Sequence, residues 1–251
     1  MAYKVPKSHP RRDSILVRER LVKGFHDGLV CGEGLIAQGR GEAFDYLLGE
    51  RTTRPAGKAA KAAAAAIILA KKPVISVNGN LAALCPAEVA GLAEEAGMLV
   101  EVNLFYRTEK RARAIGKALE KAGAKNVLGV KDAEKNIPGL GSERGRTSKQ
   151  GIHSADLVLV SMEDGDRTEA LKRMGKKVIA IDLNPLARTS KKADITVVDN
   201  VTRAFPRIAG EVRKMKGKPA LARRVLAGHD NKGLLRESLR LIKKRLETLS
   251  K

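Results

Sequence analysis

The 251-residue sequence has few of the features that secreted, membrane-spanning and base-stacking proteins need. It has no tryptophan, and aromatic residues make up only 3% of it, which leaves little to stack on nucleic-acid bases. Its two cysteines, Cys31 and Cys85, are too few for a disulfide framework and lack the spacing of a zinc site. No apolar run is long enough to span a membrane, and the start lacks the apolar core of a signal peptide. We therefore expect a cytoplasmic protein with no membrane partner.

Several catalytic signatures are also missing. The sequence has no P-loop, no GxGxxG fingerprint, no nucleophile elbow and no HExxH pair. These absences disfavour the commoner hydrolases and the dinucleotide-dependent oxidoreductases. No metal site is predicted, because the four histidines show no ligand spacing; they are His9, His26, His153 and His229.

Positive charge is what the sequence has in excess. Its 49 lysines and arginines outnumber 28 aspartates and glutamates, a net charge of +21, which predicts an anionic partner. Residues 201–251 alone hold 15 basic and 4 acidic residues. This basic segment could bind nucleic acid by contacting its phosphates. Without a recognisable DNA- or RNA-binding motif, however, nucleic acid is not expected as a specific partner.

Hydrophobic patterning divides one expected domain, residues 1–251, into three parts. Residues 1–72 are predicted to be helical, residues 73–200 to form an α/β core, and residues 201–251 to form basic C-terminal helices. The predicted helices of the first part span residues 12–29, 41–48 and 55–71.

The core is predicted from short apolar runs that alternate with amphipathic stretches. The runs are 74–77, 98–102, 127–130, 157–160, 178–181 and 195–198, and the helices predicted between them are 86–96, 108–122 and 167–174. Residues 131–154 are rich in glycine and charge, which is typical of a functional loop. This rhythm predicts an α/β fold with a doubly wound, mainly parallel sheet and helical extensions at both ends.

The last predicted helix, residues 232–249, has a heptad-like apolar seam. Its members are spaced 4,3,4,3 and are Leu235, Leu239, Ile242, Leu246 and Leu249. The seam either packs within its own subunit or supports a dimer.

A polar residue follows five of the six apolar runs. Carboxyl ends of parallel strands share one edge of a sheet, where ligands bind, so a site is predicted there; equally, each residue could be a simple turn former. The five are Asn78, Asn103, Ser161, Asp182 and Asp199.

Glycine-rich segments offer further candidates. In residues 39–41, Gly-Arg-Gly, small residues could let the backbone approach a ligand while Arg40 meets a phosphate or carboxylate, or the segment could be a turn before a helix. Asn78 and Asn80 flank Gly79, which could present backbone amides to an anion or simply form a tight strand-to-helix turn. In residues 138–145, PGLGSERG, the charges of Glu143 and Arg144 in a mobile loop could close on substrate, or the loop could be merely flexible.

Acidic residues near predicted helices and strand ends also have two interpretations. Asp164 and Asp166 could cap a helix or hold Mg²⁺ through water, and capping is favoured. Near the last two strands, carboxylate and amide groups could bind ribose and base, while Arg188 could meet a phosphate.

Taken together, the sequence resembles the archaeal phosphopantothenate synthetases from KSHPR near its start almost to its end. The resemblance is carried by GLIAQGRGEAFDYLLGERT, PVISVNGNLAALCP, VNLFYRTEKR, IPGLGSERG and the long segment EDGDRTEALKRMGKKVIAIDLNPLARTSKKADITVVDN. It implies a Rossmann-like homodimer that uses ATP, normally with Mg²⁺, to join 4-phosphopantoate and β-alanine. The implied products are 4′-phosphopantothenate, AMP and pyrophosphate, formed through an acyl adenylate in coenzyme A biosynthesis.

The resemblance also implies which residues contact ATP. Arg40 is the expected catalytic residue, since a preorganised cation could stabilise the negative charge of the transition state. The ATP contacts implied by the family pattern are Arg18, Arg40, Asp182, Leu183, Asn184, Arg188, Thr189, Asp199 and Asn200.

Overall fold

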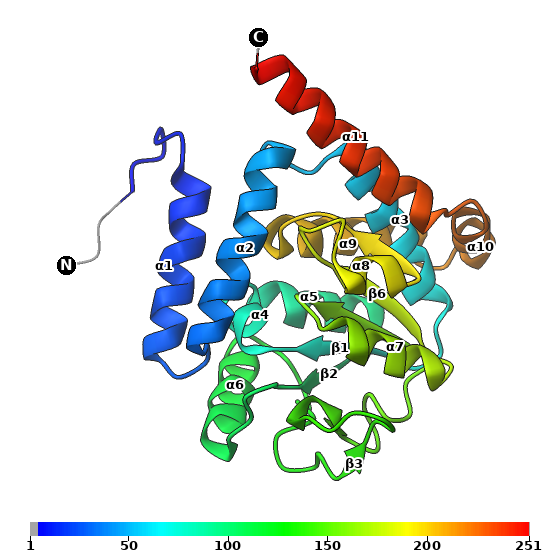
Figure 1. Cartoon of the computed structure of the whole chain (residues 1–251). Coiled ribbons are helices and arrows are strands. Elements are labelled where there is room, and N and C mark those ends of the chain that lie inside the picture. The colour runs from blue at the N-terminus through cyan, green and yellow to red at the C-terminus, as the bar shows by residue number, and fades with distance from the viewer. Residues whose placement is uncertain (1–4, 251) are drawn as a thin grey trace.

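The computed structural model describes residues 5–250, so the first four residues and Lys251 of the predicted domain lie outside it. Figure 1 shows an α/β molecule whose sheet is surrounded by helices. The helices are α1 (Arg12–His26), α2 (Gly32–Leu48), α3 (Arg54–Leu69), α4 (Gly79–Leu84), α5 (Pro86–Ala96), α6 (Glu109–Lys121), α7 (Gly165–Arg173), α8 (Arg188–Lys192), α9 (Val201–Met215), α10 (Pro219–Ala227) and α11 (Asn231–Leu249). The strands are β1 (Pro73–Val77), β2 (Leu99–Val102), β3 (Lys135–Asn136), β4 (Arg146–Thr147), β5 (Leu157–Ser161), β6 (Lys177–Ile181) and β7 (Ile195–Val197).

The main sheet has five parallel strands in the order β2-β1-β5-β6-β7. In its register Val158 of β5 pairs with Val74 of β1 on one side and Val178 of β6 on the other. The chain moves outward from β1 to β2 and then crosses back to β5, so the winding reverses between β1 and β5. This confirms the predicted doubly wound parallel sheet and puts the expected ligand crevice at that reversal.

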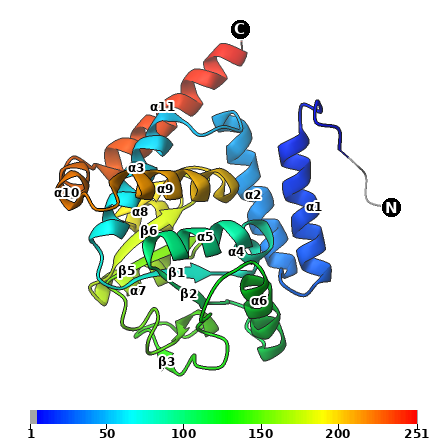
Figure 2. The same cartoon turned by 180° about the vertical axis from the view of Figure 1, so that it is seen from behind.

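Both faces of the sheet are covered, because successive side chains of a strand point to opposite faces. Ile75 and Val77 belong to the larger apolar core, which includes side chains of α3, α5 and α9. Val158 and Val160 face the smaller core, built with α7, Ala193 just after α8, and the segment between β2 and β5. In Figure 1 α7 lies in front of the sheet, and Figure 2 shows α5 and α9 on the opposite side. Burial on both faces explains why the strands read as continuous apolar runs.

One predicted strand, residues 127–130, is wrong. Leu128 makes only an isolated bridge to Glu101. Asn126 (φ 50°) and Gly129 (φ 75°) adopt positive φ, which interrupts an extended strand. The following residues 131–154 are largely irregular, as predicted, apart from the short β3–β4 ladder and a 3-10 turn at Glu143–Gly145.

The predicted helix over residues 41–48 starts too late. It begins at Gly32, so Gly39, Arg40 and Gly41 form no turn but lie inside α2. A side chain at Gly39 would meet open space, whereas one at Gly41 would touch Leu183 at 3.5 Å. Low helix propensity of glycine is a weak signal that packing overrides. The glycines therefore belong to a helix that lies close to the turn after β6.

The C-terminal seam divides into two parts. Leu235 and Ile242 are buried against Leu48, Leu183 and Val198, so the first half of α11 packs within its own subunit. Leu246 and Leu249 are 49% and 71% exposed, where α11 extends beyond the body of the molecule (Figures 1 and 2). Within residues 5–250, none of the helices combines the length and apolarity required to cross a membrane.

Candidate active site

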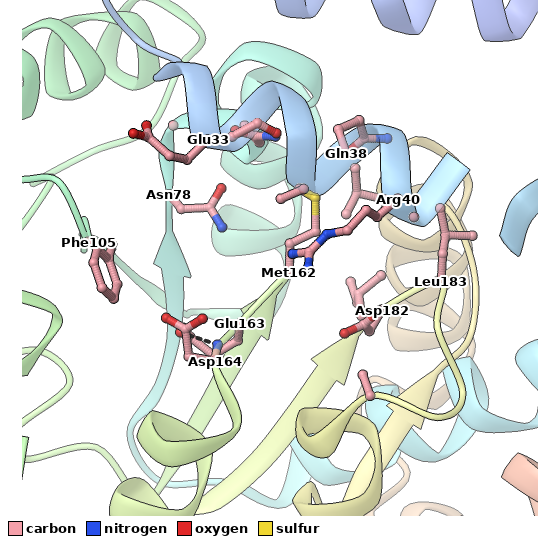
Figure 3. A pocket seen from close by; sticks show the side chains of 18 of the residues that line it. Glu33, Gln38, Arg40, Asn78, Phe105, Met162, Glu163, Asp164, Asp182 and Leu183 are labelled. Carbon is pink, nitrogen blue, oxygen red and sulfur yellow. Dashed lines mark hydrogen bonds between the residues drawn. The ribbon is translucent and has the colours of Figure 1, made fainter. Parts of the chain in front are cut away.

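A pocket of about 810 Å³ lies at the carboxyl ends of β1, β5, β6 and β7, beside α2. Its size is typical of sites that enclose small molecules. Residues 78–80, 162–164, 181–184 and 199–201 bring the ends of four strands into its wall. Figure 3 shows side chains from these segments and from α2 meeting in one place. The sheet edge predicted to carry the site therefore contains a pocket.

Asp182 occupies the turn after β6. Its carboxylate accepts a hydrogen bond from the backbone N–H of Asn184 at 2.9 Å, and Asn184 in turn accepts one from the N–H of Leu186 at 2.8 Å. Burial raises the pKa of Asp182 to about 6, against the opposing effects of the Asn184 hydrogen bond and the charge of Arg40. The turn thus presents a carboxyl group, an amide and the apolar side chain of Leu183 to the pocket.

Arg40 extends from α2 into the same end of the pocket. Figure 3 shows its side chain pointing down from the helix toward Met162, with Asp182 close by. Within residues 5–250 the guanidinium of Arg40 makes no hydrogen bond and no ion pair. An exposed guanidinium without a protein partner is available to a bound anion.

Asp199 and Asn200 close the pocket beyond β7. Asp199 accepts hydrogen bonds from Thr52 Oγ1 at 2.6 Å and from Arg203 Nε at 2.8 Å. Burial raises the pKa of Asp199, although these donors and the charge of Arg203 oppose the rise. The side-chain oxygen of Asn200 caps α9 by accepting from Thr202 N at 3.1 Å. Both side chains are therefore fixed before any ligand binds.

The opposite end of the pocket is lined by arginines from two other segments. Arg111 comes from α6, and Arg144 comes from the long segment between β2 and β5. Arg144 forms ion pairs with Glu163 and, at 3.5 Å, with Asp164. Glu163 also pairs with Arg167, whose side chain is 1% exposed. This buried network holds Arg144 at the wall instead of leaving it on a loose surface loop.

Asp164 stands at the N-cap position of α7, but its side chain makes no capping hydrogen bond. The predicted capping role of Asp164 is therefore wrong; Asp166, in the first turn, does accept from the backbone N–H of Arg167 at 2.9 Å. The Asp164 carboxyl group lines the pocket instead. No group of three or more histidine, cysteine, aspartate or glutamate side chains in residues 5–250 is arranged to hold a metal ion.

Comparison with known proteins identifies the family. The sequence profile described as phosphopantothenate/pantothenate synthetase matches residues 55–245. The chain belongs to this family. Its relatives include proteins named 4-phosphopantoate–beta-alanine ligase. The relative from Thermococcus onnurineus (strain NA1) is 50% identical over 250 residues, which cover 98% of this chain and 95% of the relative.

Two further relatives with this name come from Methanosarcina mazei and Methanospirillum hungatei. The Methanosarcina mazei protein is 48% identical over 248 residues, covering 98% of this chain and 97% of the relative. The Methanospirillum hungatei protein is 54% identical over 205 residues, covering 82% and 83%. The family resemblance read from the sequence is thereby confirmed.

Nine residues are expected to contact ATP, and six of them line the pocket: Arg40, Asp182, Leu183, Asn184, Asp199 and Asn200. The other three lie outside its lining. Arg18 pairs with Glu42 at 3.0 Å, and Arg188 pairs with Glu169 at 3.1 Å, both on exposed surface. Thr189 is buried behind the wall and donates to the carbonyl oxygen of Glu163.

Two pocket arginines were not among the predicted site residues. No local motif marks Arg111, because in the sequence it is one more charged residue of an amphipathic helix. Arg144 lies in the glycine-rich segment 138–145, for which a charge closing on substrate was one of two interpretations. Of the polar residues after the strands, Asn78, Asp182 and Asp199 line the pocket, whereas Asn103 and Ser161 do not.

Proposed function

We propose that this protein is an ATP-dependent ligase that joins 4-phosphopantoate to β-alanine, forming 4′-phosphopantothenate, AMP and pyrophosphate in coenzyme A biosynthesis. The observation that carries the proposal is the similarity over 98% of the chain to relatives with that name. The pocket supports it, because it has room for a nucleotide beside a second anion.

ATP occupies the end of the pocket that contains Arg40 and Asp182. The carboxyl group of Asp182 and the amide of Asn184 suit ribose hydroxyls and base, and Leu183 supplies apolar surface. Asp199 and Asn200 bound the same end. Arg18 and Arg188 take part only if the nucleotide draws them from Glu42 and Glu169, and Thr189 acts by supporting the backbone of Glu163.

The reaction proceeds in two steps. A carboxylate oxygen of 4-phosphopantoate attacks the α-phosphorus of ATP, and pyrophosphate leaves as the acyl adenylate forms. The neutral amine of β-alanine then attacks the acyl carbon, the amide forms after loss of a proton, and AMP leaves. No covalent bond to the protein is needed. The side chain of Arg40 stabilises the charge that builds on the phosphoryl oxygens, an effect worth about 3 to 4 kcal/mol for one such donor.

Mg²⁺ accompanies ATP in this proposal. The ion usually binds through one or two carboxylates together with substrate phosphates and waters. Asp164 fits this role, because its carboxyl group faces the pocket and caps no helix amide. When bound, the ion would neutralise phosphate charge.

We further propose a cytoplasmic homodimer. The exposed Leu246 and Leu249 at the end of α11 supply apolar surface for contact with a second copy. Burial of Leu235 and Ile242 within the subunit favours this outer part of the helix for that role.

The function is tested by incubating the protein with ATP, 4-phosphopantoate and β-alanine and identifying the products by mass spectrometry. The expected products are 4′-phosphopantothenate and AMP, and omission of either acid should abolish amide formation. ATP consumption that does not depend on the acids, or the absence of the amide product, would refute the proposal.

A further inference from the structure

Arg111 is held by main-chain oxygens and has no carboxylate partner within ion-pair distance among residues 5–250. Its Nε donates to the carbonyl oxygen of Leu29 at 2.9 Å, and its Nη1 donates to that of Tyr106 at 2.9 Å. These two bonds fix the plane of the guanidinium, and within residues 5–250 neither a hydrogen bond to a main-chain oxygen nor an ion pair holds Nη2. A charged group that is partly buried is normally paired with an opposite charge. The missing partner points to a ligand.

Gly79 explains how Arg111 reaches the pocket. A Cβ atom at this position would lie 2.5 Å from Nη2 of Arg111 and 2.1 Å from the carbonyl oxygen of Leu29. No side chain fits in that space. Gly79 and Arg111 both line the pocket, so the glycine after β1 makes room for a guanidinium.

Arg144 supplies a second cation at the same end. Its main-chain oxygen accepts hydrogen bonds from Asn103 Nδ2 and Arg167 Nε, both at 3.2 Å. Its Nη1 is bound to Glu163, and its Nε faces Asp164 at 3.5 Å. Within residues 5–250, Nη2 of Arg144 donates no hydrogen bond. Contacts with Asn103, Glu163 and Arg167 therefore hold this arginine in place while its Nη2 remains available to a ligand.

The two guanidinium groups are close enough to affect each other. Burial lowers the pKa of Arg111 and the positive charge of Arg144 lowers it further, while Cys31 and Glu33 oppose the change. Like charges held together in a pocket favour a multivalent anion between them. Arginine is suited to this task because its paired donors match the oxygens of a phosphate group.

We propose that Arg111 and Arg144 form the subsite that binds the phosphate group of 4-phosphopantoate. The inference rests on the proposed function and adds the residues that select the phosphorylated acid. This substrate has a phosphate at one end and the reacting carboxylate at the other. With its phosphate on the two arginines, its carboxylate extends toward ATP at the Arg40 end.

The subsite predicts selectivity against pantoate, which lacks the phosphate. Isothermal titration calorimetry should compare 4-phosphopantoate, pantoate and ATP on wild-type protein and Arg111→Gln. We expect the variant to bind 4-phosphopantoate at least about 30-fold more weakly, with ATP and pantoate affinities within about 2-fold of wild type. Arg113→Gln is the matched control, because Arg113 is exposed on the same helix and does not line the pocket; it should bind all three ligands as wild type does.

Three results would overturn the assignment: unchanged affinity of Arg111→Gln for 4-phosphopantoate, an equal loss of affinity for pantoate, or a defect confined to the KM of β-alanine. Unchanged ATP binding shows that the variant is folded. Should Arg111→Gln fail to fold, Arg144→Gln and the wild-type preference for 4-phosphopantoate over pantoate give the same test. Failure of the wild-type protein to make the amide refutes the proposed function itself, whereas normal turnover with unaltered binding in both variants refutes only this subsite.

Discussion

The side-chain amide of Asn103 donates a hydrogen bond to the main-chain oxygen of Arg144 at 3.2 Å. A second bond, from the same nitrogen to the main-chain oxygen of Arg146, measures 2.9 Å. Asn103 follows β2, so the end of the edge strand anchors the segment that carries Arg144. A polar residue at a strand end therefore serves the site without facing it.

Asn103→Ala tests this anchoring. The substitution removes two hydrogen bonds, each worth roughly 1 kcal/mol, and leaves two buried carbonyl oxygens with fewer donors. We expect the KM for 4-phosphopantoate to rise about 10-fold, because Arg144 loses its fixed position, while the KM for ATP stays within 2-fold. Steady-state kinetics measure both constants, and a thermal unfolding scan verifies folding. Equal increases in the two constants would show a general loss of structure instead.

Arg40 is predicted to act on the transition state. Arg40→Ala should lower kcat by about 100-fold or more, as loss of a charge-stabilising donor does, and Arg40→Lys should remain impaired because an ammonium lacks the planar paired donors. Arg51→Ala serves as the control, since Arg51 is exposed just after α2 and does not line the pocket. A higher KM with normal kcat would show that Arg40 only binds substrate and does not stabilise the transition state.

The architecture was largely readable from the sequence because buried parallel strands are continuous apolar runs that end in polar residues. Five of the six runs became strands of the main sheet. The failure at residues 127–130 has a local cause, since positive φ at Asn126 and Gly129 depends on how the chain passes the edge of the sheet.

The candidate site was readable only in part. Asp182 and Asp199 could be placed because the sheet itself brings strand ends together. The position of Arg111 could not, because it depends on the carbonyl oxygens of Leu29 and Tyr106 and on the space left at Gly79. Contacts between residues this far apart in the chain produce no recognisable motif in the sequence.

Glu101 gives the protein a pH-dependent stability. Its buried carboxyl group accepts hydrogen bonds from Ser148 N at 3.0 Å and Ile152 N at 2.5 Å, and burial raises its pKa to about 7. A carboxyl pKa that is higher in the folded state contributes stability that is complete below the unfolded value, roughly 4.3, and is lost as the pH rises through about 7.

Glu101→Gln should remove this dependence. Comparing urea unfolding at pH 4.5 and 7.5, we expect the free energy of unfolding of the variant to gain about 3 kcal/mol relative to wild type between the two pH values. The difference between the proteins cancels the titration of other groups. A difference that does not change with pH would show that Glu101 titrates normally.

The end of α11 is predicted to support a dimer. Replacing Leu246 and Leu249 with glutamine should lower the mass measured by light scattering toward the 27.0 kDa of one chain, because the exposed apolar surface is lost. Leu99→Gln is the control: Leu99 is 37% exposed at the start of β2 and distant in sequence, and its replacement should leave the mass unchanged. A double variant that keeps the wild-type mass would exclude α11 from the interface.

The adenylate route is tested most directly by isotope transfer. 4-Phosphopantoate labelled with ¹⁸O in both carboxylate oxygens is incubated with ATP, β-alanine and the protein, and AMP is analysed by mass spectrometry. Attack of the carboxylate on the α-phosphorus requires one labelled oxygen to leave with AMP and the other to stay in the amide. We therefore predict that each AMP carries a single ¹⁸O. Unlabelled AMP, or release of ADP with ¹⁸O in inorganic phosphate, would contradict a ligase that works through an acyl adenylate.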